Sequence, residues 1–169
     1  MAMRDAFLAE FDQETANTHK ALERVPDDKF AWRPHAKSGT MGWLASHLAT
    51  IPTWVGEGVH KDSIDIAPGG VPMAPPPQAT TRAGLLELFD KSVASARAAL
   101  ADASDECLQG PWSLLWSGKP VFTMPRAAMI RLWVLSHSIH HRAQLGVYLR
   151  LNDIPVPAIY GPSADEGGM

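Results

Sequence analysis

Three of the seven histidines in this 169-residue chain lie close together in the segment SHSIHHRAQLGVYLR, residues 136–150. The segment otherwise has the composition of a helix, in which these positions would normally carry aliphatic residues. Imidazole nitrogens bind divalent metals, and two histidines four positions apart lie on one helical face, where they can share one ion. The segment therefore predicts a metal-binding helix.

This predicted helix turns its histidines toward the protein interior. At about 100° per residue, His137 lies on the same stripe as Ile130 and Tyr148. His141 falls about 40° to one side of His137 and His140 about 60° to the other, so both stay on the inner half of the helix. Geometry alone leaves open which of the two joins His137.

His47 is a second inward histidine, on a different predicted helix. It lies one helical turn from Leu44 and from Ile51, which mark the buried side. Each buried imidazole without a partner would cost about 1–3 kcal/mol, and a shared cation removes that cost. For a single histidine the alternative is a hydrogen-bonded core residue. Together, the two helices favour a metal site in the core.

Four segments of the chain can form the helices that position these residues. Apolar residues recur with a helical period at about residues 4–25, 40–56, 81–103 and 125–151. Thr40 or Ser38 can cap the second segment, Thr81 opens the third, and Pro125 favours the first turn of the fourth. We therefore predict an all-α fold, with residues 1–169 forming a single domain built as a four-helix bundle.

The connections carry turn-forming residues. Residues 57–79 include APGGVPMAPPPQA, which predicts a long surface link between the second and third helices. QGPWSLLWSGKPVFTMP, residues 109–125, places apolar pieces around a Ser-Gly turn and predicts an irregular loop or a short hairpin. The tail, residues 152–169, is too rich in proline to be helical, and we expect it to fold back across the bundle.

Composition argues against several classes of function. The net charge is −3 and no basic run occurs, so nucleic-acid binding is not expected. No apolar stretch has membrane-spanning length, and we expect no membrane attachment. The segment MAMRDAFLAEFDQE is acidic and amphipathic rather than a secretory signal. Cys107 is the only cysteine and cannot form an internal disulfide, so we expect a cytoplasmic protein.

Three motifs, in this order along the chain, resemble the DinB-like (DinB/YfiT-like) superfamily of small helical metalloproteins. WRPHAKSGTMGWLASHL, residues 32–48, is similar to the family's Trp-x-Pro segment and the helix that follows it. HSIHHRAQLGVYLRL, residues 137–151, is similar to its H-x-x-x-H-R-x-Q-L signature. PVPAIYGPSADE, residues 155–166, resembles the tail of many members. Ala143 departs from the pattern, because many members have glycine there.

The resemblance implies that His47, His137 and His141 bind a divalent cation, zinc or nickel. His141 is chosen because it directly precedes the Arg-x-Gln-Leu part of the signature, and His140 becomes a neighbour near the ligands or at the solvent edge. Three protein ligands leave a coordination position open, which is typical of catalytic rather than structural sites.

The resemblance also implies a function. Some members look like metal-dependent hydrolases, and others look like transferases that use a low-molecular-weight thiol. Either activity requires a small-molecule substrate. The alternative is a protein that binds a small molecule through its metal without turnover, for example in a stress response.

Other side chains could surround the metal. Gln144 could hydrogen-bond a ligand or substrate, or instead hold a loop. Five residues could line the site or only pack in the core: Thr15, Thr18, Trp43, Trp54 and Trp133. Arg142 points outward on the helical projection as an ion-pair partner, and Tyr160 either covers the site or packs beside it. No inward carboxylate stands out as a general base.

The last predicted helix has a second apolar set on its back, made of Leu132, Leu135, Ile139 and Leu149. Exposed together, they would form a larger patch than a monomer usually tolerates. Either the tail and the long link cover these residues, or two copies pair through them. We predict a homodimer.

Overall fold

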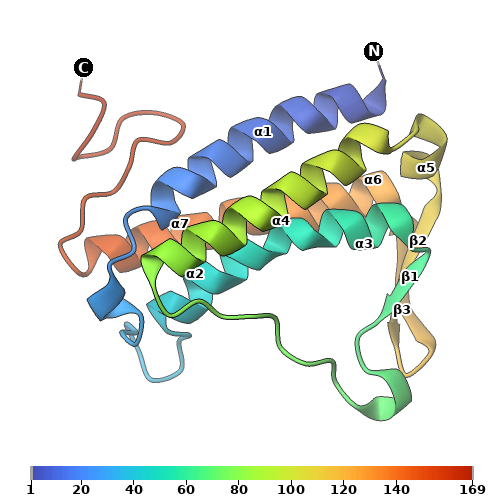
Figure 1. Cartoon of the computed structure of the whole chain (residues 1–169), viewed down its shortest axis with the longest axis horizontal. Coiled ribbons are helices and arrows are strands. Elements are labelled where there is room, and N and C mark those ends of the chain that lie inside the picture. Colours follow the sequence, from blue (N-terminus) through green and yellow to red (C-terminus); the bar gives the residue numbers. More distant parts are fainter. Residues whose placement is uncertain (1, 169) are drawn as a thin grey trace.

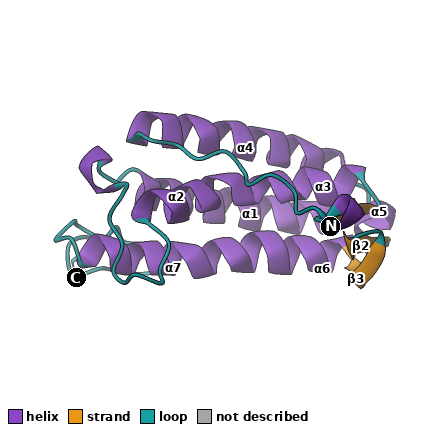
Figure 2. Cartoon of the chain, turned by 90° about the horizontal axis from the view of Figure 1, so that it is seen from below, coloured by secondary structure: helices purple, strands orange, loops and turns teal. Residues whose placement is uncertain are grey.

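The computed structural model describes residues 2–168. Its long helices lie lengthwise beside one another (Figure 1). The longer helices are α1 (Met3–Leu22), α2 (Met41–Thr50), α3 (Trp54–His60), α4 (Arg82–Asp102) and α7 (His137–Arg150). The shorter helices α5 (Asp105–Gln109) and α6 (Arg126–Met129) lie at the end that carries a small sheet (Figure 2). The predicted helical segments are confirmed, whereas α5 was not predicted.

The second predicted helix is divided in two. Thr40 caps α2, because its side chain accepts a hydrogen bond from the backbone N–H of Trp43 at 3.1 Å. A 3₁₀ turn, Ile51–Thr53, follows α2 and contains Pro52, which lacks the N–H that an uninterrupted helix would need. The chain then continues as α3. α3 continues in the direction of α2, so that Trp54 and Glu57 line the same cleft as His47 (Figure 1).

The last predicted helix is continuous but not regular. Between α6 and α7, residues Ile130–Ser136 form a π-helical stretch that ends directly before His137. A π turn holds more residues than an α turn, so the regular projection used above shifts on this side of His137. Ile130 and Val134 are nevertheless buried, and the first metal-site histidine of α7 begins a regular α-helical segment.

The prediction of an all-α four-helix bundle is wrong, because a three-stranded mixed sheet forms within residues 2–168. Its strands are β1 (Ser63–Asp65), β2 (Pro111–Trp116) and β3 (Lys119–Pro125), in the order β1-β2-β3. β1 pairs with β2 in parallel, and β2 pairs with β3 in antiparallel fashion. The hairpin alternative for residues 109–125 is therefore confirmed, while β1 lies in the segment predicted as a surface link.

The turn between β2 and β3 explains how β1 joins the sheet. Ser117 and Gly118 both have positive φ, 52° and 74°, as a tight two-residue hairpin turn requires. Their backbone N–H groups donate to the carboxylate of Asp65, at 3.0 and 2.6 Å. The end of β1 therefore binds the hairpin turn as well as the edge of β2. Together, these contacts fix residues 63–67 at one end of the helical layer.

A single apolar core runs between the helices and includes Trp112 of β2, which is fully buried. Leu135 and Leu149, predicted as part of an exposed patch, belong to this core. The tail is non-helical, as predicted, and lies at the end of the helical layer away from the sheet (Figure 2). No helix among residues 2–168 is both long and apolar enough to cross a bilayer.

Candidate metal centre

Three imidazoles from two helices meet at one point. His47 comes from α2, and His137 and His141 lie one turn apart on α7. The Nε2 atom of His137 is 3.3 Å from that of His47 and 2.8 Å from that of His141. One ligand atom from each of the three rings lies within 4.8 Å of the others. The structure thus brings together the three residues named from the sequence.

The other nitrogen of each α7 ring has its own partner. His137 Nδ1 lies 3.3 Å from the carbonyl oxygen of Trp133, and His141 Nδ1 lies 2.7 Å from Oε1 of Gln144. Both partners are acceptors, so each Nδ1 carries the hydrogen and each Nε2 presents a lone pair. Two lone pairs that face each other at 2.8 Å repel unless a cation lies between them. The donor set therefore fits a bound metal ion.

The surroundings keep these imidazoles neutral. Burial, followed by the neighbouring imidazoles of His141 and His137, lowers the pKa of His47 to about 4. Burial also lowers the pKa of His137, and that of His141 although its hydrogen bond to Gln144 acts in the opposite direction. Neutral imidazole is the form that binds metals, so the site is ready to accept a cation at neutral pH.

Tryptophans flank the histidines, as one of the two alternatives predicted. The indole of Trp43 stacks on the ring of His47, with centroids 5.3 Å apart and planes 12° from parallel. Trp54 lines a cleft beside His47, and Trp133 lines a separate hollow with His137 and His140. Trp54 and Trp133 also contact each other at 6.0 Å, so they serve both the site and the core.

A cleft of about 470 Å³ opens beside His47. Its lining includes Glu57, a carboxylate that the sequence reasoning missed, whose Oε2 lies 2.7 Å from Nζ of Lys61. The sequence does contain a pattern that indicates Glu57. Helical spacings of three and four residues connect His47, Thr50, Trp54 and Glu57. The predicted helix ended one residue too early to show it. A carboxylate therefore shares a cleft with one of the histidines.

A second depression, of about 450 Å³, lies on the other side of Trp43. It is lined by His141 and Gln144 together with Val147 and Tyr148 of α7. The histidine cluster is thus bordered by three hollows, lined respectively by His47, by His141 and, with a volume of about 380 Å³, by His137.

His140 and the two threonines lie away from the point where the Nε2 atoms meet. His140 is exposed and accepts a contact of 3.1 Å from the Gln144 amide, which places it at the solvent edge, one of the two alternatives. The hydroxyls of Thr15 and Thr18 donate to backbone carbonyls within α1. Both threonines therefore have the structural role that was one of their alternatives.

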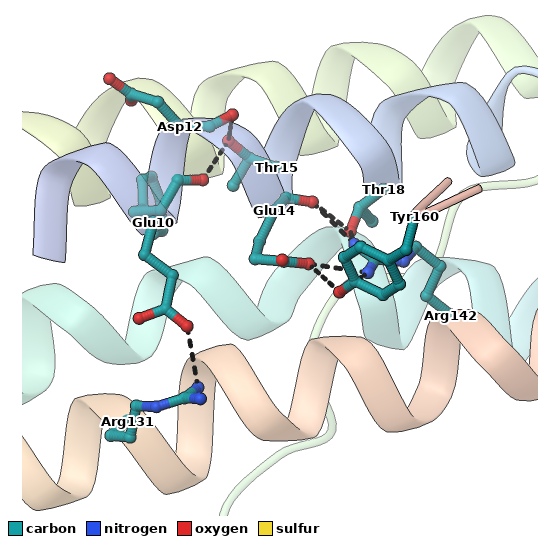
Figure 3. A network of polar contacts seen from close by, with 9 residues as sticks. Glu10, Asp12, Glu14, Thr15, Thr18, Arg131, Arg142 and Tyr160 are labelled. Carbon is teal, nitrogen blue, oxygen red and sulfur yellow. Dashed lines mark hydrogen bonds and ion pairs between the residues drawn. The ribbon is translucent and has the colours of Figure 1, made fainter. Parts of the chain in front are cut away.

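Arg142 was predicted to point outward, and this prediction is wrong. Its side chain is only 4% exposed and donates a hydrogen bond of 2.7 Å to the carboxylate of Glu14 on α1. The hydroxyl of Tyr160 accepts from Arg142 and donates to the same carboxylate at 2.7 Å (Figure 3). The role as an ion-pair partner is confirmed, and Tyr160 packs on this network.

Comparison with known proteins points to one family. A family model described as the DinB superfamily matches residues 10–145. The uncharacterized protein YrdA of Bacillus subtilis (strain 168) is 25% identical over 164 residues, which cover 96% of this chain and 90% of YrdA.

Crystal structures of DinB-like proteins have a similar fold. One from Bacillus cereus ATCC 10987 has a TM-score of 0.72 and 23% sequence identity, covering 92% of this chain and 97% of its own. Another, YjoA from Bacillus subtilis, has a TM-score of 0.68 and 17% identity, covering 90% of this chain and 96% of its own. At these identities, the likeness concerns the fold.

Proposed function

Because the chain belongs to the DinB superfamily and brings three imidazoles to one point, we propose that it is a divalent-metal-dependent enzyme. The reaction we propose is either hydrolysis or transfer of a low-molecular-weight thiol to a small-molecule substrate. Both reactions need the same step, the activation of a weak nucleophile at neutral pH.

The observation that carries this proposal is the direction of the lone pairs. His137 and His141 each give the Nδ1 hydrogen to a protein acceptor, so that the Nε2 of His137 faces the Nε2 atoms of both His141 and His47. Ring orientation fixed through the second nitrogen is a regular feature of metal-binding histidines. Three histidines that served only to pack the core would not need hydrogen-bond acceptors at Nδ1 together with Nε2 lone pairs that point toward one another.

The number of ligands supports catalysis over a structural role. Among residues 2–168, the grouped metal-ligating side chains are His47, His137 and His141. Structural zinc sites normally have four protein ligands, whereas catalytic sites have three and keep a position open. A divalent cation supplies Lewis acidity there and lowers the pKa of a coordinated water or thiol.

Residues of this chain can be assigned to the remaining tasks. Gln144 orients the ring of His141 through the Nδ1 hydrogen bond. Trp43 stacks on His47 and shields it from water on one face. Glu57 lines the cleft beside His47, and we assign to it the transfer of a proton to or from a substrate held there.

For the metal we propose zinc or nickel. All three ligands are imidazoles, which suit zinc, nickel and copper and bind magnesium or calcium poorly. Neutral imidazoles also leave the full charge of the cation available to a nucleophile. The family resemblance supports the choice of zinc or nickel within that group.

The test compares two neighbouring histidines. The wild-type chain and His140→Ala should each hold one metal ion per chain in elemental analysis, whereas His141→Ala should hold far less. The metal-loaded proteins are then screened with ester, amide and thiol-adduct substrates, and activity should disappear only in His141→Ala. Metal binding without any turnover would favour a non-catalytic small-molecule-binding protein instead. A wild-type chain that takes up no divalent cation would refute the proposal.

A further inference from the structure

The cleft beside His47 has an apolar lining that the histidine cluster itself does not require. Ile51 and Trp54 contribute from the helical side, and Ile64 and Ile66 from β1 and the residue that follows it. Met73 and Ala74, from the Pro- and Gly-rich segment after β1, close the far wall. A volume of about 470 Å³ falls within the range of small-molecule sites.

This wall is held in place by hydrogen bonds. The backbone N–H of Met73 donates to the carbonyl of Ile66 at 2.9 Å, and that of Ala67 donates to Asp65 at 3.0 Å. Because Asp65 also binds the β2–β3 turn, the segment after β1 is tied to the sheet. The chain's own hydrogen bonds therefore order this wall, which reduces the ordering that ligand binding requires.

The charges that line the cleft restrict what can enter. Among residues 2–168, Glu57 is the one carboxylate that lines the cleft, and no lysine or arginine lines it. Lys61 pairs with Glu57 but is not one of the lining residues. An anionic group would therefore meet a carboxylate and apolar walls without a basic partner, which disfavours its entry.

We infer that this cleft binds an uncharged apolar group, alkyl or aryl, of the substrate that reacts at the histidine cluster. This inference rests on the proposed function, because it requires the reacting end of the substrate to lie at the metal. The apolar group would extend from His47 along Trp54 toward Ile66 and Ala74. The hollow beyond His141 would then remain for a second, more polar reactant.

The experiment measures binding rather than activity. Zinc-loaded full-length protein is titrated calorimetrically with acetohydroxamate, hexanohydroxamate and octanohydroxamate, which share one metal-binding end and differ in alkyl length. A buried methylene contributes about 0.8 kcal/mol, which corresponds to about a fourfold gain in affinity. We expect a gain of about two- to fourfold per methylene. The monohydroxamate of suberic acid, which ends in a carboxylate, should lose most of the gain seen with octanohydroxamate.

Two matched variants test which hollow provides the gain in affinity with alkyl length. Ala74→Trp adds a bulky side chain to an exposed residue that lines the cleft, and it should abolish the dependence on alkyl length. Val147→Trp makes a similar change at an exposed residue of the hollow beyond His141, and it should leave the dependence intact. Acetohydroxamate affinity should stay unchanged in both variants, which shows that each remains folded and metal-loaded.

The outcomes separate this inference from the function on which it rests. If acetohydroxamate binds but longer chains bind no better, the inference is overturned and the metal site stands. If Val147→Trp removes the gain and Ala74→Trp does not, the apolar group lies in the hollow beyond His141 and the inference is again overturned. If the protein retains no zinc, the proposed function itself fails.

Discussion

Gln144 shows how one exposed side chain can orient a residue of the candidate metal site. It accepts the Nδ1 hydrogen of His141 at 2.7 Å, while its amide contacts His140 at 3.1 Å. The glutamine thereby selects the tautomer of a ligand and holds its ring at a fixed angle. The sequence left open whether this residue serves the site or a loop, and the structure assigns it to the site.

Replacing Gln144 with leucine should weaken zinc binding by about 10–100-fold, as expected when a partner of a metal ligand is lost. The affinity is measured by competition with a chromogenic chelator. Gln13→Leu serves as the control, because Gln13 is also an exposed helical glutamine but lies on α1. Equal zinc affinities for Gln144→Leu and the wild type would show that the hydrogen bond does not orient His141.

The metal-free protein should lose stability as the pH falls below neutral. In the unfolded chain a histidine takes up a proton near pH 6.5, whereas folded His47 has a pKa lowered to about 4. Between these values the unfolded state binds more protons, so the free energy of unfolding decreases as the pH is lowered from 6.5 toward 4. Urea midpoints at several pH values in this window, measured with a chelator present, provide the test.

His47→Gln is the matched variant for this pH series, since it removes the most strongly perturbed imidazole. Its midpoint should change less with pH than that of the wild type. The same slope in both proteins would mean that another group causes the loss of stability.

Much of the site could be predicted from residue types, and the remainder depends on packing. Inward helical positions singled out His47 and His137, whereas the choice of His141 over His140 came from the resemblance to the family signature and not from spacing. Glu57 was missed because the predicted helix ended one residue before it. In the structure, a 3₁₀ turn at Pro52 is followed by α3, which contains Glu57. Arg142 was placed outward because a helical projection contains no information about the carboxylate on α1 that receives it.

At the scale of elements, α1 is joined to the helix that carries the histidine pair by two ion pairs. Arg142 reaches Glu14, and Arg131 reaches Glu10 at 3.1 Å (Figure 3). The first pair is buried, and the second is partly exposed. Since Arg142 directly follows His141, the buried pair also fixes the rotation of α7 that turns His141 inward.

Arg142→Met should lower the free energy of unfolding by about 3–5 kcal/mol, because it leaves the Glu14 carboxylate buried without its partner. Adding Glu14→Leu to Arg142→Met should recover most of this loss, since a buried pair replaced by apolar residues costs little. Urea denaturation measures both. As a control, Arg97→Met breaks an exposed pair between α4 and α1 and should lower the stability far less, because exposed ion pairs contribute little. Equal losses for Arg142→Met and Arg97→Met would contradict the argument.

The sheet shows why the fold class was mistaken. Hairpin β2–β3 has local signals, namely apolar strands around Ser117 and Gly118, and it was one of two predicted alternatives. β1 has only three residues and pairs with β2 across about fifty intervening positions, so no local periodicity can reveal it. The error matters for function, because Ile64 and Ile66 of this region line the cleft beside His47.

On the scale of the whole molecule, the homodimer remains a prediction, and only part of the apolar set on which it was based is exposed. Leu135 and Leu149 are buried in the chain's own core, so they are not available to a partner. Of the predicted set, Leu132, 53% exposed, and the half-buried Ile139 remain on the outside of the helix that runs from α6 to α7. These two residues define the surface that a second copy would cover.

We expect the wild-type protein to sediment as a dimer at high concentration and Leu132→Asp/Ile139→Asp to sediment as a monomer. A charge buried at the centre of an apolar interface opposes association. Val121→Asp changes an exposed valine in the hairpin and should leave the sedimentation coefficient unchanged. A monomeric wild type would disprove the prediction.

His47 and His137 are 90 residues apart in the chain, and most of the fold separates them. During synthesis the ribosome releases α2 long before α7, so the nascent chain has only one of the three imidazoles available through most of translation. A cation held by all three nitrogens would therefore be captured only after α7 has docked, from the pool that the folded protein meets. The identity of the resident ion would then reflect cellular supply at that moment as much as the preference of the three nitrogens.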